Sequence, residues 1–147
     1  MIPDRIEREI VIDAPQDRVW SLMTEPEFWV AKGDTTQVRV REGALIVSDH
    51  PDYGRFPQRI EKIEPQRCIA YRWASTFPGE EPRPGNSTLV EYTLTEEEGK
   101  TRLRVVESGF ATLAASEDVR RKSFDGNTEG WADELDGFRK RAEQQVA

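Results

Sequence analysis

The chain has 147 residues, of which 33% are charged, a net charge of −7 and a single cysteine. This length suits one domain with its own core, and the negative charge disfavours nucleic acid and anionic membrane surfaces as partners. Cys68 alone excludes an intrachain disulfide, and the sequence has no apolar run that would act as a signal peptide or membrane span, so we expect one cytoplasmic domain over residues 1–147.

The first part of the chain predicts a strand followed by two short helices. In IEREIVID the isoleucines alternate with charged residues, which is typical of a strand with one buried face. Pro15 ends this strand and suits the first turn of a helix over residues 15–23. Thr24, followed by acidic residues and a proline, predicts the N-cap of a second short helix.

The middle of the chain predicts consecutive strands. Two extended runs flank Glu42-Gly43 and predict a hairpin, and further strands are indicated by GRFPQRIEKIEP, RCIAYRWAST, STLVEYTL and TRLRVVESGF. A loop over residues 77–86, rich in proline and glycine, is predicted to be mobile. Strands that follow one another through short turns favour an antiparallel sheet with helices on one face.

The end of the chain predicts a long helix that lies on the sheet. Ser116, followed by two acidic residues, predicts its start, and a kink is expected around Gly126-Asn127. One side of the helix carries an apolar stripe of Phe124, Trp131, Leu135, Phe138 and Ala142. Away from this stripe lie three glycines, which suit a solvent face, a flexible gate or a close contact with another subunit: Gly126, Gly130 and Gly137.

Four segments in this order carry a resemblance to a known family: IVIDAPQDRVWSLMTEPEFW, GRFPQRIEKIEPQRCIAYRW, STLVEYTLTEEEGKTRLRVVESGF and GWADELDGF. The chain resembles the START-like, helix-grip (SRPBCC) superfamily, and within it the branch of the activator of heat-shock-protein-90 ATPase homologues. The resemblance implies an α+β fold, with a curved antiparallel sheet of about six to seven strands gripping a long C-terminal helix and two short helices after the first strand. It also implies a cavity between sheet and helix that binds apolar or amphipathic small molecules in many relatives.

Strand and helix periodicity directs several large side chains into the space between sheet and helix. Either they fill the core, or some of them line a ligand cavity. The predicted ligand-binding candidates are Trp73, Tyr92, Trp131, Leu135, Tyr71, Phe56 and Trp20, together with Glu107.

Glu107 is the most informative candidate because it shares a predicted inner strand face with Leu103 and Val105. An unpaired buried carboxylate is costly and takes up a proton or finds a cation. Two alternatives remain open: the strand end turns Glu107 to solvent, or Glu107 is a polar anchor in the cavity, with Arg72 or Tyr92 as its partner.

The sequence assigns no catalytic residue, and we expect no cofactor and no metal. His50 and Cys68 do not form a ligand cluster, and motifs of serine hydrolases, phosphate-binding loops and dinucleotide-binding turns are missing. The preferred function is a non-catalytic domain that binds a small apolar or amphipathic molecule. One alternative is a cyclase- or hydratase-like enzyme that uses Glu107, Tyr92 or Tyr71, and another is a chaperone-interacting module. The sequence does not indicate the ligand or the oligomeric state.

Overall fold

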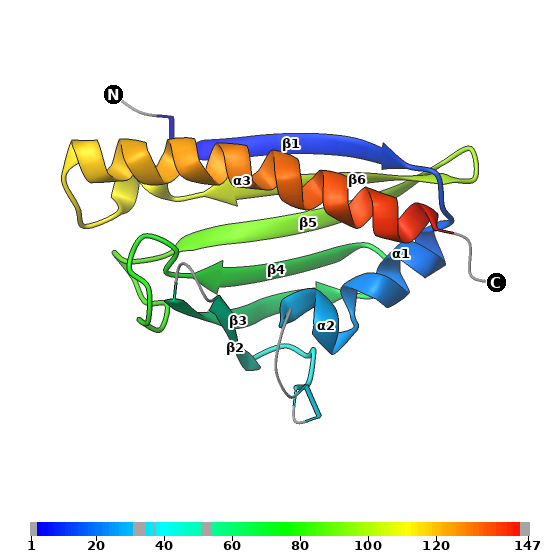
Figure 1. Ribbon diagram of the computed structural model, residues 1–147, viewed down its shortest axis with the longest axis horizontal. Helices are drawn as coiled ribbons and strands as arrows, with labels where there is room; N and C mark the ends of the chain where they lie inside the picture. Colours follow the sequence, from blue (N-terminus) through cyan, green and yellow to red (C-terminus); the bar gives the residue numbers. More distant parts are fainter. Residues whose placement is uncertain (1–2, 31–34, 37, 51–53, 145–147) are drawn as a thin grey trace.

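One antiparallel sheet carries the fold of the described residues, which are 3–30, 35–36, 38–50 and 54–144 of a computed structural model. Its six strands have the order β1-β6-β5-β4-β3-β2 (Figure 1). They are β1 (Arg5–Ile12), β2 (Leu45–His50), β3 (Gly54–Glu64), β4 (Cys68–Trp73), β5 (Thr88–Glu97) and β6 (Lys100–Ser108). Every neighbouring pair is antiparallel, which confirms the predicted α+β class and sheet type.

The helices gather on one side of this sheet. They are α1 (Gln16–Met23), α2 (Pro26–Trp29), the short 3-10 helix η1 (Phe110–Thr112) and α3 (Glu117–Glu143). Figure 1 shows α3 lying along β1 and β6, with α1 and α2 near its C-terminal end. The predicted two short helices after the first strand and the long terminal helix are therefore confirmed.

The helix α3 starts where the sequence predicts. It is not interrupted at Gly126-Asn127, where a kink was expected. The Ser116 hydroxyl oxygen accepts the Val119 N–H at 3.2 Å, as an N-cap does. The helix then continues without interruption through Gly126. A Cβ placed on Gly126, Gly130 or Gly137 would meet no atom of the described residues within 4 Å, which fits the solvent-face interpretation of these glycines.

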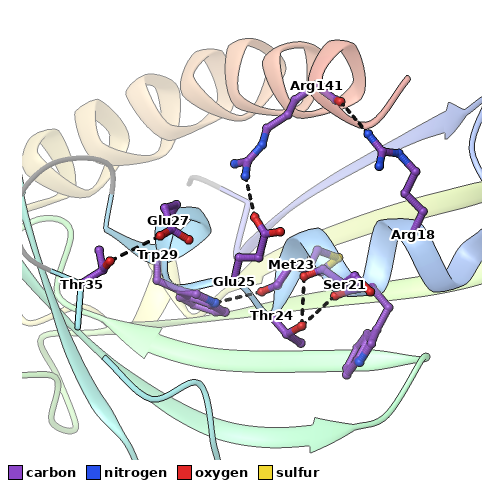
Figure 2. A network of polar contacts seen from close by, with 10 residues as sticks. Arg18, Ser21, Met23, Thr24, Glu25, Glu27, Trp29, Thr35 and Arg141 are labelled. Carbon is purple, nitrogen blue, oxygen red and sulfur yellow. Dashed lines mark hydrogen bonds and ion pairs between the residues drawn. The ribbon is translucent and has the colours of Figure 1, made fainter. Parts of the chain in front are cut away.

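The C-terminal end of α3 is fastened to α1 by an arginine (Figure 2). The Arg18 side chain donates from Nε to the Ala142 carbonyl at 2.8 Å and from Nη2 to the Gln144 carbonyl at 3.0 Å. Nearby, the Arg141 guanidinium pairs with Glu25 at 2.7 Å. Because the last carbonyls of a helix have no partner within the helix, Arg18 both caps α3 and fixes it to the layer of short helices.

The prediction that Thr24 caps the second helix is wrong. Its hydroxyl donates backwards to the carbonyls of Trp20 and Ser21, each at 3.1 Å, so Thr24 ends α1 (Figure 2). The second helix, α2, starts instead at Pro26 and has no side-chain cap. Proline suits this first position because it has no N–H that needs an acceptor.

The predicted hairpin around Glu42-Gly43 is also wrong. Residues 38–40 are not in a strand, and only the second run forms one, β2. The backbone after the turn pairs with β3: Gly43 N–H donates to the Ile60 carbonyl at 2.8 Å, and Ile60 N–H donates to the Ala44 carbonyl at 2.9 Å. β3 therefore bonds to the backbone groups after the turn that a hairpin with the first run would have used.

The loop over residues 77–86 has specific internal hydrogen bonds. Asn86, which is buried, accepts the Arg83 N–H at 2.7 Å and donates to the Glu81 carbonyl at 3.0 Å. The Gly85 carbonyl accepts the Ala114 N–H at 2.7 Å, which joins the loop to the segment before α3. Its predicted mobility stays a prediction.

Candidate functional site

Side-chain alternation along β6 brings a carboxyl group into the core. Leu103, Val105 and Glu107 follow one another on the inner face, and the exposed fraction of Glu107 is 0%. In the sheet Glu107 stands between Ile6 of β1 and Val90 of β5, which are both buried apolar residues. Of the two alternatives that the sequence leaves open, the one that turns Glu107 to solvent is therefore wrong, and its role as a polar anchor stays a prediction.

Four side chains among the described residues donate hydrogen bonds to this carboxylate. At Oε1 the donor is the Trp131 indole N–H (2.8 Å), and at Oε2 the donors are the Trp73 indole N–H (2.9 Å) and the Thr88 hydroxyl (2.6 Å). The Asn127 amide donates to both oxygens, at 3.1 and 3.2 Å. Because an indole nitrogen can only donate, Glu107 is the acceptor that ties α3 to β4 and β5.

Polar contacts next to this cluster hold α3 against the segment that follows β4. The Asn127 amide also donates to the Ser75 hydroxyl at 3.0 Å. One turn earlier on α3, the Ser123 hydroxyl lies 2.6 Å from that of Thr76. The donors around Glu107 are thus positioned by a network and not by single contacts.

The groups that hydrogen-bond to Glu107 are all neutral, so the carboxylate has no counter-ion in contact with it among the described residues. Burial raises the pKa of Glu107 above its usual range, and the four hydrogen bonds oppose this shift by stabilising the ionised form.

Neither predicted partner of Glu107 is confirmed. Arg72 is half-exposed and its Nε lies 3.9 Å from Glu61, because its position in β4 alternates with the buried Tyr71 and so faces outward. In the described part of the chain, Tyr92 makes ring contacts near the site but no hydrogen bond to the carboxylate.

Aromatic rings close a circuit with the carboxylate. From Trp73 the ring centroids run to Tyr71 at 6.0 Å, then to Tyr92 at 6.0 Å and to Trp131 at 5.8 Å. We call these four residues the aromatic arc; its two ends are the indoles that donate to Glu107. Burial raises the pKa of the Tyr71 and Tyr92 hydroxyls, and the negative charge of Glu107 adds to this shift, so both phenols are neutral.

The other predicted residues lie at different distances from this circuit. Phe56 contacts Trp73 at 5.8 Å between ring centroids, and both rings are partly exposed. Leu135 is buried one turn of α3 beyond Trp131. Trp20 packs against the core from α1. This helix contacts the C-terminal end of α3, away from Glu107. The structure therefore brings together all the predicted residues except Trp20.

Thr88 and Asn127 contact Glu107 although the sequence analysis did not select them. The signals were present in the sequence. Thr88 lies two positions before Val90 in β5, so the two side chains share the inner face of the strand. Asn127 precedes Trp131 by four positions in α3, which places Asn127 and Trp131 on one helix face.

Side chains meet across the space between the sheet and α3. The Phe28 ring packs edge-on against Trp29 at 5.4 Å, Tyr92 at 5.7 Å and Phe138 at 5.2 Å. A hollow of about 430 Å³ that the described residues form lies elsewhere, on the first half of α3, and is broadly open to solvent. It is lined by Asp118, Arg121, Lys122, Asp125, Gly126 and Glu129. The predicted cavity beneath α3 stays a prediction.

Comparison with known proteins supports the fold. The family model described as "Activator of Hsp90 ATPase homolog 1-like protein" matches residues 13–143. No curated protein matches the chain. None of the helices in the described residues is both long and apolar enough to cross a membrane.

Three solved structures illustrate the similarity. MLL2253 from Mesorhizobium loti has a TM-score of 0.74 and 21% identity, over 97% of this chain and 99% of that one. The Aha1 dimer from Colwellia psychrerythraea has a TM-score of 0.70 and 18% identity, over 97% of each chain. DynU16, from the dynemicin biosynthetic locus, has a TM-score of 0.72 and 22% identity over 97% of this chain, which spans 48% of DynU16. At these identities the likeness shows the helix-grip fold.

Proposed function

The chain belongs to the family of Activator of Hsp90 ATPase homolog 1-like proteins, and from that premise we propose that it binds a small apolar or amphipathic molecule between the sheet and α3. Glu107 is the polar anchor of this site. The observation that carries the proposal is a fully buried carboxylate beside a circuit of aromatic rings, to which every hydrogen-bond donor among the described residues is neutral.

Stability alone does not account for this carboxylate. Burying an ionised group costs several kcal/mol, and apolar residues of similar volume often replace buried charges without loss of stability. Leu103 and Val105 occupy the preceding inner positions of β6 in the ordinary way. A costly group at the next inner position is typical of a functional site.

Trp73 gives the site its access to solvent. Trp73 at the end of β4 and Phe56 on β3 are partly exposed, whereas Trp131 is buried. A ligand therefore reaches Glu107 by displacing the Trp73 indole, and binding includes the cost of this rearrangement.

Binding of N-phenyl-1-naphthylamine, an uncharged aromatic probe whose fluorescence rises in apolar surroundings, tests the proposal. We expect saturable binding and an upward thermal shift, with affinity reduced about tenfold in Glu107→Leu because the polar anchor is lost. Glu129→Gln is the matched control, since Glu129 is an exposed carboxylate of α3. If Glu107→Leu does not fold, Glu107→Gln takes its place. Absence of saturable binding, or equal affinity of wild type and the Glu107 variant, contradicts the proposal.

Acid–base catalysis is a second candidate, favoured by the burial that raises the pKa of Glu107. The carboxyl group would move protons on a bound substrate, as in the predicted cyclase- or hydratase-like enzyme. Solvent deuterium exchange at the methylene group of 1-phenylbutane-1,3-dione measures this. Exchange that is faster with wild type than with Glu107→Gln supports catalysis, and equal rates rule it out for this diketone.

A further inference from the structure

We infer that the molecule bound at Glu107 carries an ammonium group, which the carboxylate and the aromatic arc enclose together. This inference rests on the proposed function and specifies the chemical class of the ligand. It follows from three features of the site. These are the circuit of rings, the neutrality of every described group that hydrogen-bonds to Glu107, and the indole N–H of Trp73, which a ligand can replace.

The circuit has the composition of a cation site. Four aromatic rings at centroid spacings of 5.8 to 6.0 Å lead from one oxygen of Glu107 round to the other. Successive rings are strongly inclined at both ends, at 69° between Trp73 and Tyr71 and at 83° between Tyr92 and Trp131. At each end of the arc the edge of one ring therefore meets the face of the next, and an ammonium group that displaces such an edge is attracted to the face within about 6 Å of the centroid.

The charge of the site lacks a counterpart. Every described side chain that hydrogen-bonds to Glu107 is neutral, and the phenols of Tyr71 and Tyr92 are neutral as well. Besides burial and Glu107, the negative charge of Glu134 on α3 raises the pKa of Tyr92. The local field therefore favours a cation and opposes an anion.

An ammonium group can take the place of the Trp73 donor without leaving an oxygen unpaired. At Oε2 the donors are the Trp73 N–H at 2.9 Å, the buried Thr88 hydroxyl at 2.6 Å and the Asn127 amide at 3.2 Å, so that two donors remain when Trp73 leaves. An ammonium N–H restores this hydrogen bond and, unlike the neutral indole, brings a positive charge next to the carboxylate. A ligand hydroxyl restores only the hydrogen bond, and a ligand carboxylate is repelled. The expected order of affinity is ammonium, then alcohol, then carboxylate.

Three naphthalene probes of equal ring size test this order: 1-naphthylmethylamine, 1-naphthylmethanol and 1-naphthoate, titrated calorimetrically into the full chain near neutral pH. We expect the amine to bind about tenfold more tightly than the alcohol, and the carboxylate more weakly still. In Glu107→Gln the amine and the alcohol should bind equally. In Glu129→Gln, which removes an exposed charge of α3, the preference for the amine should persist.

The outcomes separate this inference from the function on which it rests. Equal binding of amine and alcohol by wild type overturns the ammonium inference but leaves small-molecule binding intact. Tightest binding of the carboxylate overturns it too. Loss of the amine preference in Glu129→Gln would assign it to the overall negative charge of the protein. If none of the three probes binds, the proposed function itself fails. The wild-type series decides between these outcomes even if Glu107→Gln does not fold.

Discussion

Replacing Glu107 by Gln has two effects on stability, and they depend differently on pH. The first comes from hydrogen bonding. Trp131 donates to one carboxylate oxygen and Trp73 to the other, whereas Gln offers only one acceptor oxygen. If that oxygen serves the buried Trp131, the Trp73 N–H faces an amide donor. A buried donor without an acceptor costs about 1–3 kcal/mol, and because Trp73 is partly exposed we expect a cost of about 1 kcal/mol that is the same at every pH.

The second effect is the cost of ionising the wild-type residue. Burial raises the pKa of Glu107 in the folded protein, so the folded state keeps its proton at pH values where the unfolded chain has lost it. The stabilisation is fully present below the unfolded pKa and is lost as the pH rises through the folded pKa. Each pKa unit is worth about 1.4 kcal/mol. Gln shows no such loss, so its deficit relative to wild type shrinks as the pH rises.

Urea denaturation, followed by tryptophan fluorescence and circular dichroism between about pH 5 and about pH 8, measures both effects. We expect Glu107→Gln to be less stable than wild type at the acid end and the difference to narrow toward the alkaline end. Glu129→Gln, an exposed carboxylate on the same helix, should track wild type throughout. A difference that stays constant would show that the pKa of Glu107 is not raised. A difference that widens with pH would show that the four donors outweigh burial.

Three further predictions concern the surroundings of the site. Asn127→Asp places a second carboxyl group where the amide now donates to Glu107 at 3.1 Å. We expect the free energy of unfolding to fall by about 3 kcal/mol at neutral pH. Chemical denaturation that shows no greater loss of stability than for Asn127→Leu would contradict this. Arg18→Ala removes the hydrogen bonds to the last carbonyls of α3, so stability should fall by about 1 kcal/mol and amide exchange should accelerate in the last turn; unchanged exchange there would refute the capping role. Gly130→Ala should raise stability by about 0.5–1 kcal/mol because its Cβ meets open space, whereas Gly109→Ala should lower it by about 1–2 kcal/mol because the φ of Gly109 is +104°; thermal melts with the opposite order would contradict both.

Local patterns predicted the elements that depend on local physics. Alternation along β6 placed Glu107 on the inner face because successive strand residues point to opposite sides whatever the rest of the fold does. Ser116 likewise starts α3 through contacts within a single turn. Thr24 was misassigned for a related reason: two helices adjoin there, and a hydroxyl between them can serve the end of one or the start of the other.

Pairing between distant segments lay beyond such patterns. The alternating run before Glu42-Gly43 reads as a strand, but β3 pairs with the residues after the turn. The partners of Glu107 are separated from it by 34 positions for Trp73 and by 24 for Trp131. Only the register of the sheet and the placement of α3 bring them to one carboxylate. The exclusion of Arg72, by contrast, follows from parity, since Tyr71 and Trp73 already take the inner face.

The carboxyl group of Glu107 sets this position apart from the apolar residues Leu103 and Val105, which fill the core at the preceding inner positions of β6. For filling alone, an apolar residue at this position would continue the series of Leu103 and Val105 at lower cost. The chain instead places a carboxylate there and satisfies it with donors from β4, β5 and α3. Trp73, which is partly exposed, shares Oε2 with the buried Thr88 and with Asn127. Under the proposed function the Trp73 indole leaves for a ligand while the remaining donors hold the carboxylate in place, so that the packed interior and the binding site would be two states of the same arrangement.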